Sequence, residues 1–453
     1  MLESLFQLRE RGTTVGMEAL AGVTTFMVMA YIIFVNPAIL SFASATALQG
    51  QGPPFAATLA ATCIVAALAT AAMGLASNYP LAVASGMGLN AVVAFQLIAG
   101  QRLPWPAAMG VIFLEGVAIT VLVVTGFREA VMNAIPMSQK RAISVGIGLF
   151  ILFIGLVNGG IVKPGPGIPV TLGTLTSPKV AVAVAGLFLT LLLLALRIRA
   201  ALLLGIATTT VLAIVVNAMG GGKVWMLPGV AVIPSQLVAW PDFSTLGRGV
   251  NVEVFWRLGV LTAILTIFSI MLSDFFDTMG TVVGIGAEAG WLDKNGRLPR
   301  LNRVLLVDSL AAVVGGWFSA SSATTYIESA AGVSAGGQTG LTSVVVALGF
   351  ALALFFAPIA GVVPPEATAA ALVVVGYLMC TLVREIPFGD LEEGFPALLT
   401  MTLMPFTYSI TNGIGAGFIA YVFIKCVCGK PGEVHPMLYA AAAAFVVYFV
   451  LPH

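Results

Sequence analysis

Two aspartates, Asp274 and Asp277, follow a long apolar run in the segment "SDFFDTMGT". Residues three apart on a helix lie about 60° apart around its axis and share a face. Like charges at this spacing resist double ionisation, which favours one proton held between them. An ionised carboxylate at membrane depth costs at least about 2.5 kcal/mol. The pair therefore predicts a site for a proton, or for a ligand that donates hydrogen bonds.

Three further carboxylates, Glu115, Asp308 and Glu328, also lie inside apolar runs. The Lys and Arg residues all fall in loops or at the ends of these runs, and both His residues lie in the C-terminal tail. The five carboxylates therefore lack an evident basic partner, and one of them must carry any transported proton. Sodium bound by the same oxygens is the alternative. Asp308 is also consistent with a cytoplasmic helix end, and the role of Glu115 stays open.

The composition defines the class of protein. Of 453 residues, 59% are hydrophobic and 9% are charged, whereas a soluble domain has about 25% charged residues. We expect an all-α polytopic membrane protein. The net charge of +1 suggests no nucleic-acid partner. The four Cys do not have the spacing of a disulfide framework or a zinc site, and we expect no metal or cofactor beyond a coupling ion.

Fourteen stretches are long and apolar enough to cross a bilayer. They cover residues 17–40, 55–76, 81–99, 105–126, 138–158, 177–197, 200–219, 256–282, 303–318, 321–336, 341–363, 367–383, 394–410 and 412–428. A long loop, 220–255, divides them seven and seven, and an odd number per half inverts one half relative to the other, as in many secondary transporters. The C-terminal stretch 437–452 is either a fifteenth span or a helix on the surface.

The basic residues of the short loops predict the orientation. With fourteen spans, the clusters of basic residues named below all fall on one side, which we assign to the cytoplasm together with the N-terminus. The multi-pass chain is thus expected in the plasma (inner) membrane. The residues concerned are Arg9, Arg11, Arg128, Lys140, Arg141, Arg197, Arg199, Lys294, Arg297, Arg300, Arg303, Arg384, Lys425 and Lys430.

The third span of each half is short and rich in Gly, Ala and Ser. Its stretches "LAVAS" and "ATTYIES" are plausible extended segments. Non-helical backbone at membrane depth requires protein or water partners, and broken helices in matching positions indicate a transporter's binding site. The alternative is that the small residues only allow close helix packing. Glu328 lies in the second broken span. Asn90 lies at the comparable place in the first, as a ligand or a cap at the break.

The candidate site residues come from these segments. We predict Asp274 and Glu328 as the main substrate ligands, and the Phe275 ring either stacks on a flat substrate or only packs. Asp277 is divided between proton coupling and a structural role, and Asp274 and Glu328 are also candidates for the proton. Further substrate contacts are expected at Asn90, Gly88, Thr325 and Ile327.

These residues stand in recognisable motifs. The stretches "SDFFDTMGT", "GWLDKNGRLPRLNRVLLVDSL", "SASSATTYIESAAGVSAGGQTGLT", "EALAGVTTFMVMAYIIFVNPAIL" and "ASGMGLNA" resemble those of AzgA-like purine permeases. These belong to the nucleobase–cation symporter 2 group of the nucleobase/ascorbate transporter superfamily. The resemblance runs from about residue 9 to the tail. It implies proton-coupled transport of adenine, guanine and hypoxanthine, with binding residues at Asp274, Glu328 and Asn90 and a second family Asp at Asp277.

The resemblance also implies a division into domains. Residues 17–126 and 256–363 would form a core domain, and residues 127–219 and 364–428 a gate domain, which tends to mediate homodimers in this family. Residues 220–255 would be an extracytoplasmic connecting loop, and 429–453 a hydrophobic tail outside the family's basic plan.

Other functions fit the sequence less well. The xanthine/uracil branch carries a motif of Gln, Glu or Pro, then Asn, any residue, Gly, and Thr five residues later, and no Asn here fits it. An anion transporter on the same architecture would favour a positive site over paired carboxylates. A membrane enzyme would need a metal cluster or a nucleophile–base pair, and the apolar runs contain no His.

Overall fold

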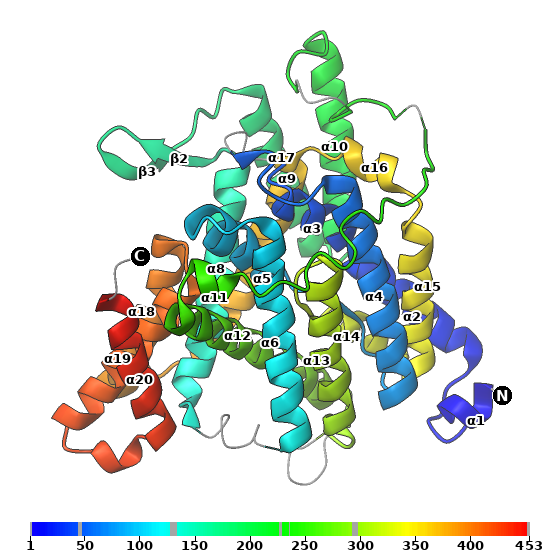
Figure 1. The fold of residues 1–453 in the computed structure, drawn as a ribbon. Coiled ribbons are helices and arrows are strands. Elements are labelled where there is room, and N and C mark those ends of the chain that lie inside the picture. The colour runs from blue at the N-terminus through cyan, green and yellow to red at the C-terminus, as the bar shows by residue number, and fades with distance from the viewer. Residues whose placement is uncertain are drawn as a thin grey trace.

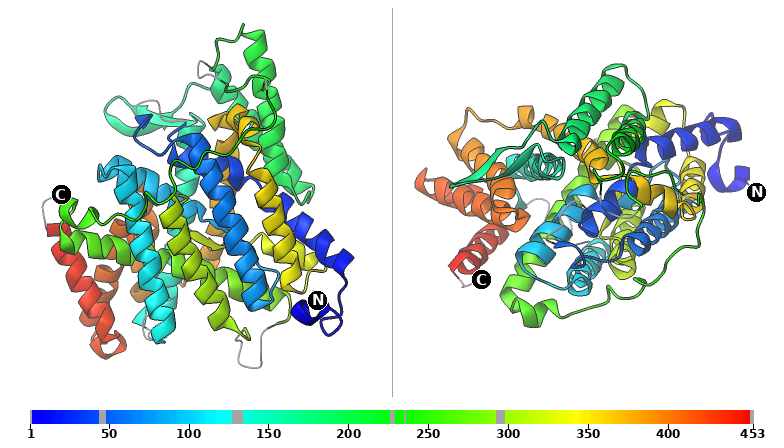
Figure 2. Two further views of the ribbon diagram at one scale, coloured as in Figure 1. Left: turned by 45° about the vertical axis from the view of Figure 1, so that its right-hand side comes forward. Right: turned by 90° about the horizontal axis from the view of Figure 1, so that it is seen from above.

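The computed structural model describes residues 2–43, 48–126, 134–225, 229–234, 236–291 and 298–450. Arg128, Lys294 and Arg297, which contributed to the predicted orientation, lie outside these residues. The described chain is a bundle of helices lying side by side (Figure 1). Seen from above, the two ends of the chain lie on opposite sides of the bundle (Figure 2).

The elements of the first half follow the predicted spans closely. They are α1 (Leu2–Phe6), α2 (Val15–Met29), α3 (Ile32–Leu40), α4 (Phe55–Ser77), β1 (Val83–Ser85), α5 (Met87–Ala91), the π-helix η2 (Val92–Gly100), α6 (Trp105–Thr125), α8 (Met137–Asn158), β2 (Val162–Gly165), β3 (Ile168–Leu172), α9 (Pro178–Ala195) and α10 (Ala201–Met219).

The second half repeats this order. Its elements are α11 (Val254–Arg257), α12 (Val260–Glu288), α13 (Leu301–Phe318), β4 (Ala323–Thr325), α14 (Ser329–Ser334), α15 (Gly340–Ala353), α16 (Ala357–Val362), α17 (Pro365–Cys380), η3 (Thr381–Glu385), α18 (Leu391–Thr407), α19 (Ile410–Val427), η4 (Pro431–Glu433) and α20 (Pro436–Val450).

Proline and left-handed residues mark many helix ends. The helices α4, α6 and α8 begin directly after Pro54, Pro104 and Pro136, where the missing N–H costs no helical hydrogen bond. The helices α4 and α6 end at Asn78 and Gly126, both at positive φ, as is common after a C-terminal turn. Local sequence signals therefore set these boundaries.

Each of the fourteen predicted spans coincides with a helix or with a broken segment. Ten helical segments in the described part are long and apolar enough to cross a membrane. Two spans predicted as continuous are divided: 17–40 breaks between α2 and α3, and 341–363 breaks between α15 and α16. Within the stretch 437–452, the described residues belong to the 15-residue helix α20, which packs on α19.

The two halves pack with a twofold pattern. Helix α6 packs on α13 and, in the equivalent positions, α4 packs on α15. Likewise α8 packs on α18 where α9 packs on α17, and α12 contacts α6 where α2 contacts α15. Exchanging each element with its counterpart seven spans away leaves these contacts unchanged. This is the arrangement expected of an inverted repeat.

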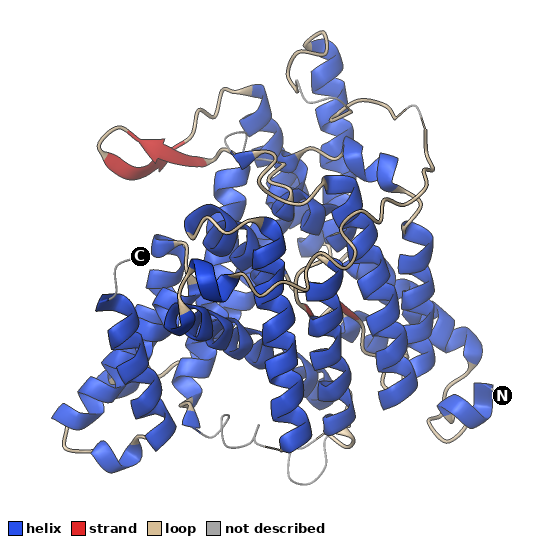
Figure 3. Cartoon of the chain, viewed as in Figure 1, coloured by secondary structure: helices blue, strands red, loops and turns tan. Residues whose placement is uncertain are grey.

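The two predicted extended stretches are confirmed as strands β1 and β4. They pair antiparallel in the middle of the bundle (Figure 3), with Val83 opposite Thr325 and Ser85 opposite Ala323. The outer edge of β1 is bonded by Thr70 of α4, whose Oγ1 accepts from Val83 N (2.9 Å) and donates to Val83 O (2.8 Å). The backbone groups of this non-helical segment thus find partners within the protein.

Glu18 joins α2 to the start of α15. Its side chain is fully buried, and its carboxylate accepts hydrogen bonds from the backbone N–H groups of Gln338, Thr339 and Thr342 and from the Thr342 hydroxyl. These donors lie at a helix N-terminus, where the backbone dipoles favour negative charge. The buried charge therefore holds two helices together.

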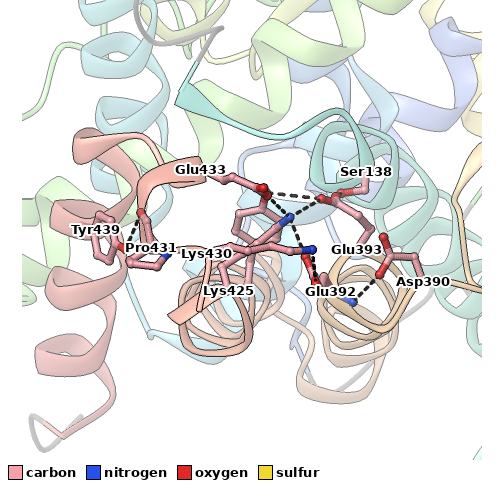
Figure 4. A network of polar contacts seen from close by, with 10 residues as sticks. Ser138, Asp390, Glu392, Glu393, Lys425, Lys430, Pro431, Glu433 and Tyr439 are labelled. Atoms are coloured by element: carbon pink, nitrogen blue, oxygen red, sulfur yellow. Dashed lines mark hydrogen bonds and ion pairs between the residues drawn. The ribbon is translucent and has the colours of Figure 1, made fainter. Parts of the chain in front are cut away.

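A cluster of charged residues fastens the C-terminal region (Figure 4). The Lys425 ammonium of α19 lies 2.9 Å from a carboxylate oxygen of Glu392 on α18 and 2.8 Å from one of Glu433 in η4. Lys430, in the following turn, lies 2.6 Å from Glu392, and this contact raises the pKa of Lys430. The network ties α18, α19 and the start of α20 together.

We expect Glu18→Ala to lower the free energy of unfolding by about 3 kcal/mol, because buried N–H donors lose charge-assisted bonds. Thermal unfolding of the detergent-solubilised protein, followed by size-exclusion chromatography, would measure the shift. Glu10→Ala is the matched control, because Glu10 lies near the N-terminus of the chain, as Glu18 does, but is exposed. Equal melting temperatures for the two variants would contradict this role of Glu18.

Candidate functional site

A cavity lies beside the strand pair. Its empty space is about 560 Å³, including space open to solvent. Main-chain segments at the start of α5 and after β4 form one wall, α12 forms a second, and α8 with α17 forms a third. The lining residues are Tyr31, Gly86, Met87, Gly88, Leu89, Ile147, Ser273, Asp277, Thr281, Thr324, Thr325, Tyr326, Ile327, Glu328, Val375 and Met379.

Glu328 reaches the cavity from the turn between β4 and α14. Tyr31, at the break between α2 and α3, donates a hydrogen bond from its hydroxyl to Glu328 Oε1 at 2.7 Å. A second tyrosine, Tyr326, donates to the carbonyl oxygen of Ser85. One tyrosine thus orients the carboxylate, and the other ties the two broken segments together beside it.

Asp277 faces the same cavity from α12. Its side chain is partly exposed, whereas most neighbouring residues of α12 are buried. Thr324 of β4, another lining residue, interacts with its carboxylate. Neither Asp277 nor Glu328 forms a salt bridge with a described residue. Two acceptor groups without a paired cation therefore face one space.

Asp274 lies outside the cavity lining. It is 1% exposed, and its Oδ2 accepts a hydrogen bond from Ser322 Oγ at 3.1 Å. The same hydroxyl lies 3.4 Å from Glu115 Oε2 on α6. The 60° between Asp274 and Asp277 thus turns one carboxylate toward the cavity and the other toward α6. Direct substrate contact by Asp274 stays a prediction, and Asp277 has the more favourable position.

Some of the other predicted site residues line the cavity, and others lie outside its lining. Gly88, Thr325 and Ile327 line the cavity. Phe275 does not, and its ring packs at 5.8 Å from that of Phe276 in the hydrophobic core. Asn90 is fully buried one turn after Met87, and neither its amide nitrogen nor its amide oxygen has a hydrogen-bond partner among the described residues. Asn90 does not line the cavity, so its contact with a substrate stays a prediction, although buried amides rarely remain unpaired.

Asp308 lies in the interior. Its two oxygens accept hydrogen bonds of 2.7 Å from Thr278 of α12 and Thr325 of β4. Asp308 lies in the first half of α13 and is buried; that this end of α13 faces the cytoplasm stays a prediction. Asp308 connects α13 to α12, which carries Asp277, and to β4, which precedes the turn that carries Glu328.

Sequence reasoning missed several residues of this site. Tyr31 and Ser322 are polar groups within apolar segments, and the criterion that selected the carboxylates would have found them if applied to hydroxyls. Ile147, Val375 and Met379 line the cavity from α8 and α17. They are ordinary apolar residues in ordinary apolar helices, and no sequence signal distinguishes them.

The site can therefore bind a small, largely neutral molecule that presents hydrogen-bond donors to two carboxylates. It has main-chain groups on one side and apolar side chains on the other, which suits a flat ring. A model of the Permease family matches residues 16–450. The chain belongs to this family. It is a multi-pass membrane transporter and not an enzyme.

Relatives of known name cover the whole permease. It is 40% identical to the adenine permease AdeP of Escherichia coli (strain K12) over 99% of this chain and 96% of that one. It is 38% identical to the guanine/hypoxanthine permease PbuG of Bacillus subtilis (strain 168), over 99% of both chains. The transmembrane domain of the cyanobacterial bicarbonate transporter BicA shares its fold, with a TM-score of 0.60, 13% identity and coverage of 88% and 96%.

Gly88 sets the distance between the cavity wall and α8. A Cβ at this position would lie 2.5 Å from Ile147 Cγ2, which is too close for an unshifted side chain. We expect Gly88→Ala to reduce transport by the permease, because overpacking of this kind costs about 1–3 kcal/mol. Uptake of a radiolabelled substrate, normalised to the amount of protein in the membrane, would measure the loss.

Adding Ile147→Ala to Gly88→Ala tests the cause. The second change removes the atom that clashes, so the double variant should recover part of the lost uptake. Ile147→Ala alone is the matched control. If the two losses simply add, contact with Ile147 is not the reason that position 88 requires glycine.

Proposed function

We propose that the permease imports the purine nucleobases adenine, guanine and hypoxanthine by proton symport. The observation that carries the proposal is the pair of cavity carboxylates, Asp277 and Glu328. They face one space from two different segments, and neither forms a salt bridge with a described residue. The names of full-length relatives, among them an adenine permease and a guanine/hypoxanthine permease, support purines as the substrate class.

The chemistry of a purine fits this pair. Its edges carry N–H donors and ring-nitrogen acceptors, and its faces are flat and apolar. A carboxylate accepts N–H donors in strong charge-assisted bonds. Asp277 and Glu328 would accept from the ring, the main chain around Gly88 and Ile327 would offer further contacts, and the Asn90 amide can both donate and accept.

Transport would proceed by alternating access between two bodies. The proposed core comprises residues 17–126 and 256–363, and the proposed gate residues 127–219 and 364–428. The cavity is lined from both, because Ile147, Val375 and Met379 come from gate helices and the carboxylates from core segments. Movement of the core past the gate would expose this cavity to each side in turn, with the N-terminus in the cytoplasm.

Protons are the proposed coupling ion because buried carboxylates are the available titratable groups. Both His residues lie in the C-terminal tail of the sequence, and His435, the one within the described residues, is exposed. Sodium is the alternative, since carboxylate and carbonyl oxygens also bind it. An anion substrate, suggested by the shared fold with a bicarbonate transporter, is disfavoured because carboxylates line the cavity.

We expect Asp277→Asn and Glu328→Gln each to weaken purine uptake by roughly 10- to 100-fold, the equivalent of one charge-assisted hydrogen bond of about 1.5–3 kcal/mol. Uptake of radiolabelled adenine, guanine and hypoxanthine would be measured in cells without purine carriers. Asp390→Asn, at a helix end remote from the cavity, is the control, and surface labelling would verify membrane insertion. Wild-type uptake by both cavity variants would exclude this site.

We expect uptake of a neutral purine to increase as the external pH falls, because the proton is a co-substrate, and to be indifferent to external sodium. Initial rates would be measured at fixed membrane potential, with pH and sodium varied separately. Rates that follow sodium and ignore pH would overturn proton coupling while leaving the purine assignment intact.

A further inference from the structure

The pair formed by Glu115 and Asp274 is separate from the cavity. Glu115, on α6, is fully buried, and Asp274, on α12, is 1% exposed. One hydroxyl joins the two carboxyl groups: Ser322 Oγ lies 3.4 Å from Glu115 Oε2 and 3.1 Å from Asp274 Oδ2. Neither residue lines the cavity, so the substrate contacts proposed for the cavity do not explain why these two carboxyl groups are buried together.

Counting hydrogen-bond donors shows that the pair is incomplete when both groups are ionised. Two carboxylates accept only, and Ser322 has a single proton to donate. Glu115 Oε1 and Asp274 Oδ1 are both buried without a hydrogen-bond partner among the described residues. One added proton between the carboxyls converts one of them into a donor and satisfies the other.

The surrounding charges do not replace that proton. The nearest titratable groups, Asp277 on α12 and Asp308 on α13, are also carboxylic acids. The cations on the described elements packed against α6 and α12 have other partners. Arg303 of α13 donates to the carbonyl oxygen of Ala76, and Arg141 of α8 pairs with Glu385. Lys140 of α8 lies over the Phe276 ring, Lys425 of α19 pairs with Glu392 and Glu433, and Arg257 of α11 pairs with Glu253.

We propose that Glu115 and Asp274 together bind the transported proton, in a site distinct from the purine cavity. This inference rests on the proton symport proposed above. A proton from outside binds to the doubly ionised pair, is carried as the shared proton of a carboxylic acid–carboxylate pair, and leaves to water on the inside, which restores the two carboxylates. No other bond forms or breaks.

Two short connections link this site to the cavity. Asp274 lies one turn before Asp277 on α12. Ser322 directly precedes β4, whose Thr324 interacts with Asp277. Loss of the shared proton would leave two negative charges competing for the Ser322 hydroxyl, and the resulting shift of α12 and β4 would reach the cavity carboxylate. Proton binding and purine binding can therefore influence each other.

The test uses the full-length protein in liposomes with a fluorescent pH indicator inside. In wild type, an inward proton gradient should drive accumulation of hypoxanthine, and added hypoxanthine should acidify the lumen. In Glu115→Gln, we expect exchange of internal for external hypoxanthine to persist, whereas lumen acidification and gradient-driven accumulation are lost. Glu366→Gln is the matched control, because Glu366 is a buried carboxylate with its own donor, Trp225 Nε1 at 2.9 Å.

The outcomes separate this inference from the proposed function. If wild type neither accumulates nor exchanges hypoxanthine, the proposed function fails. If wild type acidifies the lumen and Glu115→Gln does so equally per hypoxanthine taken up, the proton site is wrong and the symporter stands. Wild-type exchange without acidification would overturn the proton site and proton coupling together.

A second variant covers the case in which Glu115→Gln does not yield monodisperse protein. Glu115→Asp keeps a carboxyl group on a shorter side chain, so the geometry of the pair changes and its chemistry does not. The proposal requires lumen acidification to persist with a displaced pH dependence of accumulation. A pH profile identical to that of wild type would overturn it.

Discussion

The structure depends on one constraint: backbone N–H and C=O groups of a non-helical segment inside a membrane must find partners within the protein. An unpaired group in hydrocarbon costs several kcal/mol. Strands β1 and β4 meet this requirement for each other, and Thr70 closes one outer edge. The two broken segments are tolerated because their strands pair with each other. This pairing requires the third span of each half to lie next to the other in the middle of the bundle.

This pairing also locates the site. The helices α5 and α14 begin directly beyond the strands, so main-chain groups of both repeats face the space next to α12. Asp308 fixes the geometry, because its oxygens accept from Thr278 of α12 and Thr325 of β4. The carboxylates of the cavity are thus positioned by a hydrogen-bonded frame, and the apolar side chains of α8 and α17 complete the enclosure.

The elements were predictable from the sequence because their signals are local. Apolar length, proline at helix starts and clusters of small residues in matching positions need no knowledge of neighbours. The different surroundings of Asp274 and Asp277 were not predictable. They share a helix face in the sequence pattern, and only packing shows that α6 presents Glu115 to the first while the cavity opens to the second. Tyr31 and Ser322 were not predicted, because a search for charged groups in apolar segments does not select hydroxyls.

The different surroundings of the two aspartates suit different ligands. The buried pair of Glu115 and Asp274, in which one oxygen of each carboxyl has no hydrogen-bond partner among the described residues, suits a proton. The carboxylates of the cavity have room for a ring. Asp274 and Asp277 both lie on α12, one turn apart. A change in the charge of one aspartate therefore alters the electrostatic field at the other. Linkage then requires reciprocity: if a proton on the inner pair strengthens purine binding by some factor, purine binding strengthens retention of that proton by the same factor. Coupling of this kind needs no contact between the proton and the purine. It needs only a helix, here α12, that contributes a residue to both binding sites.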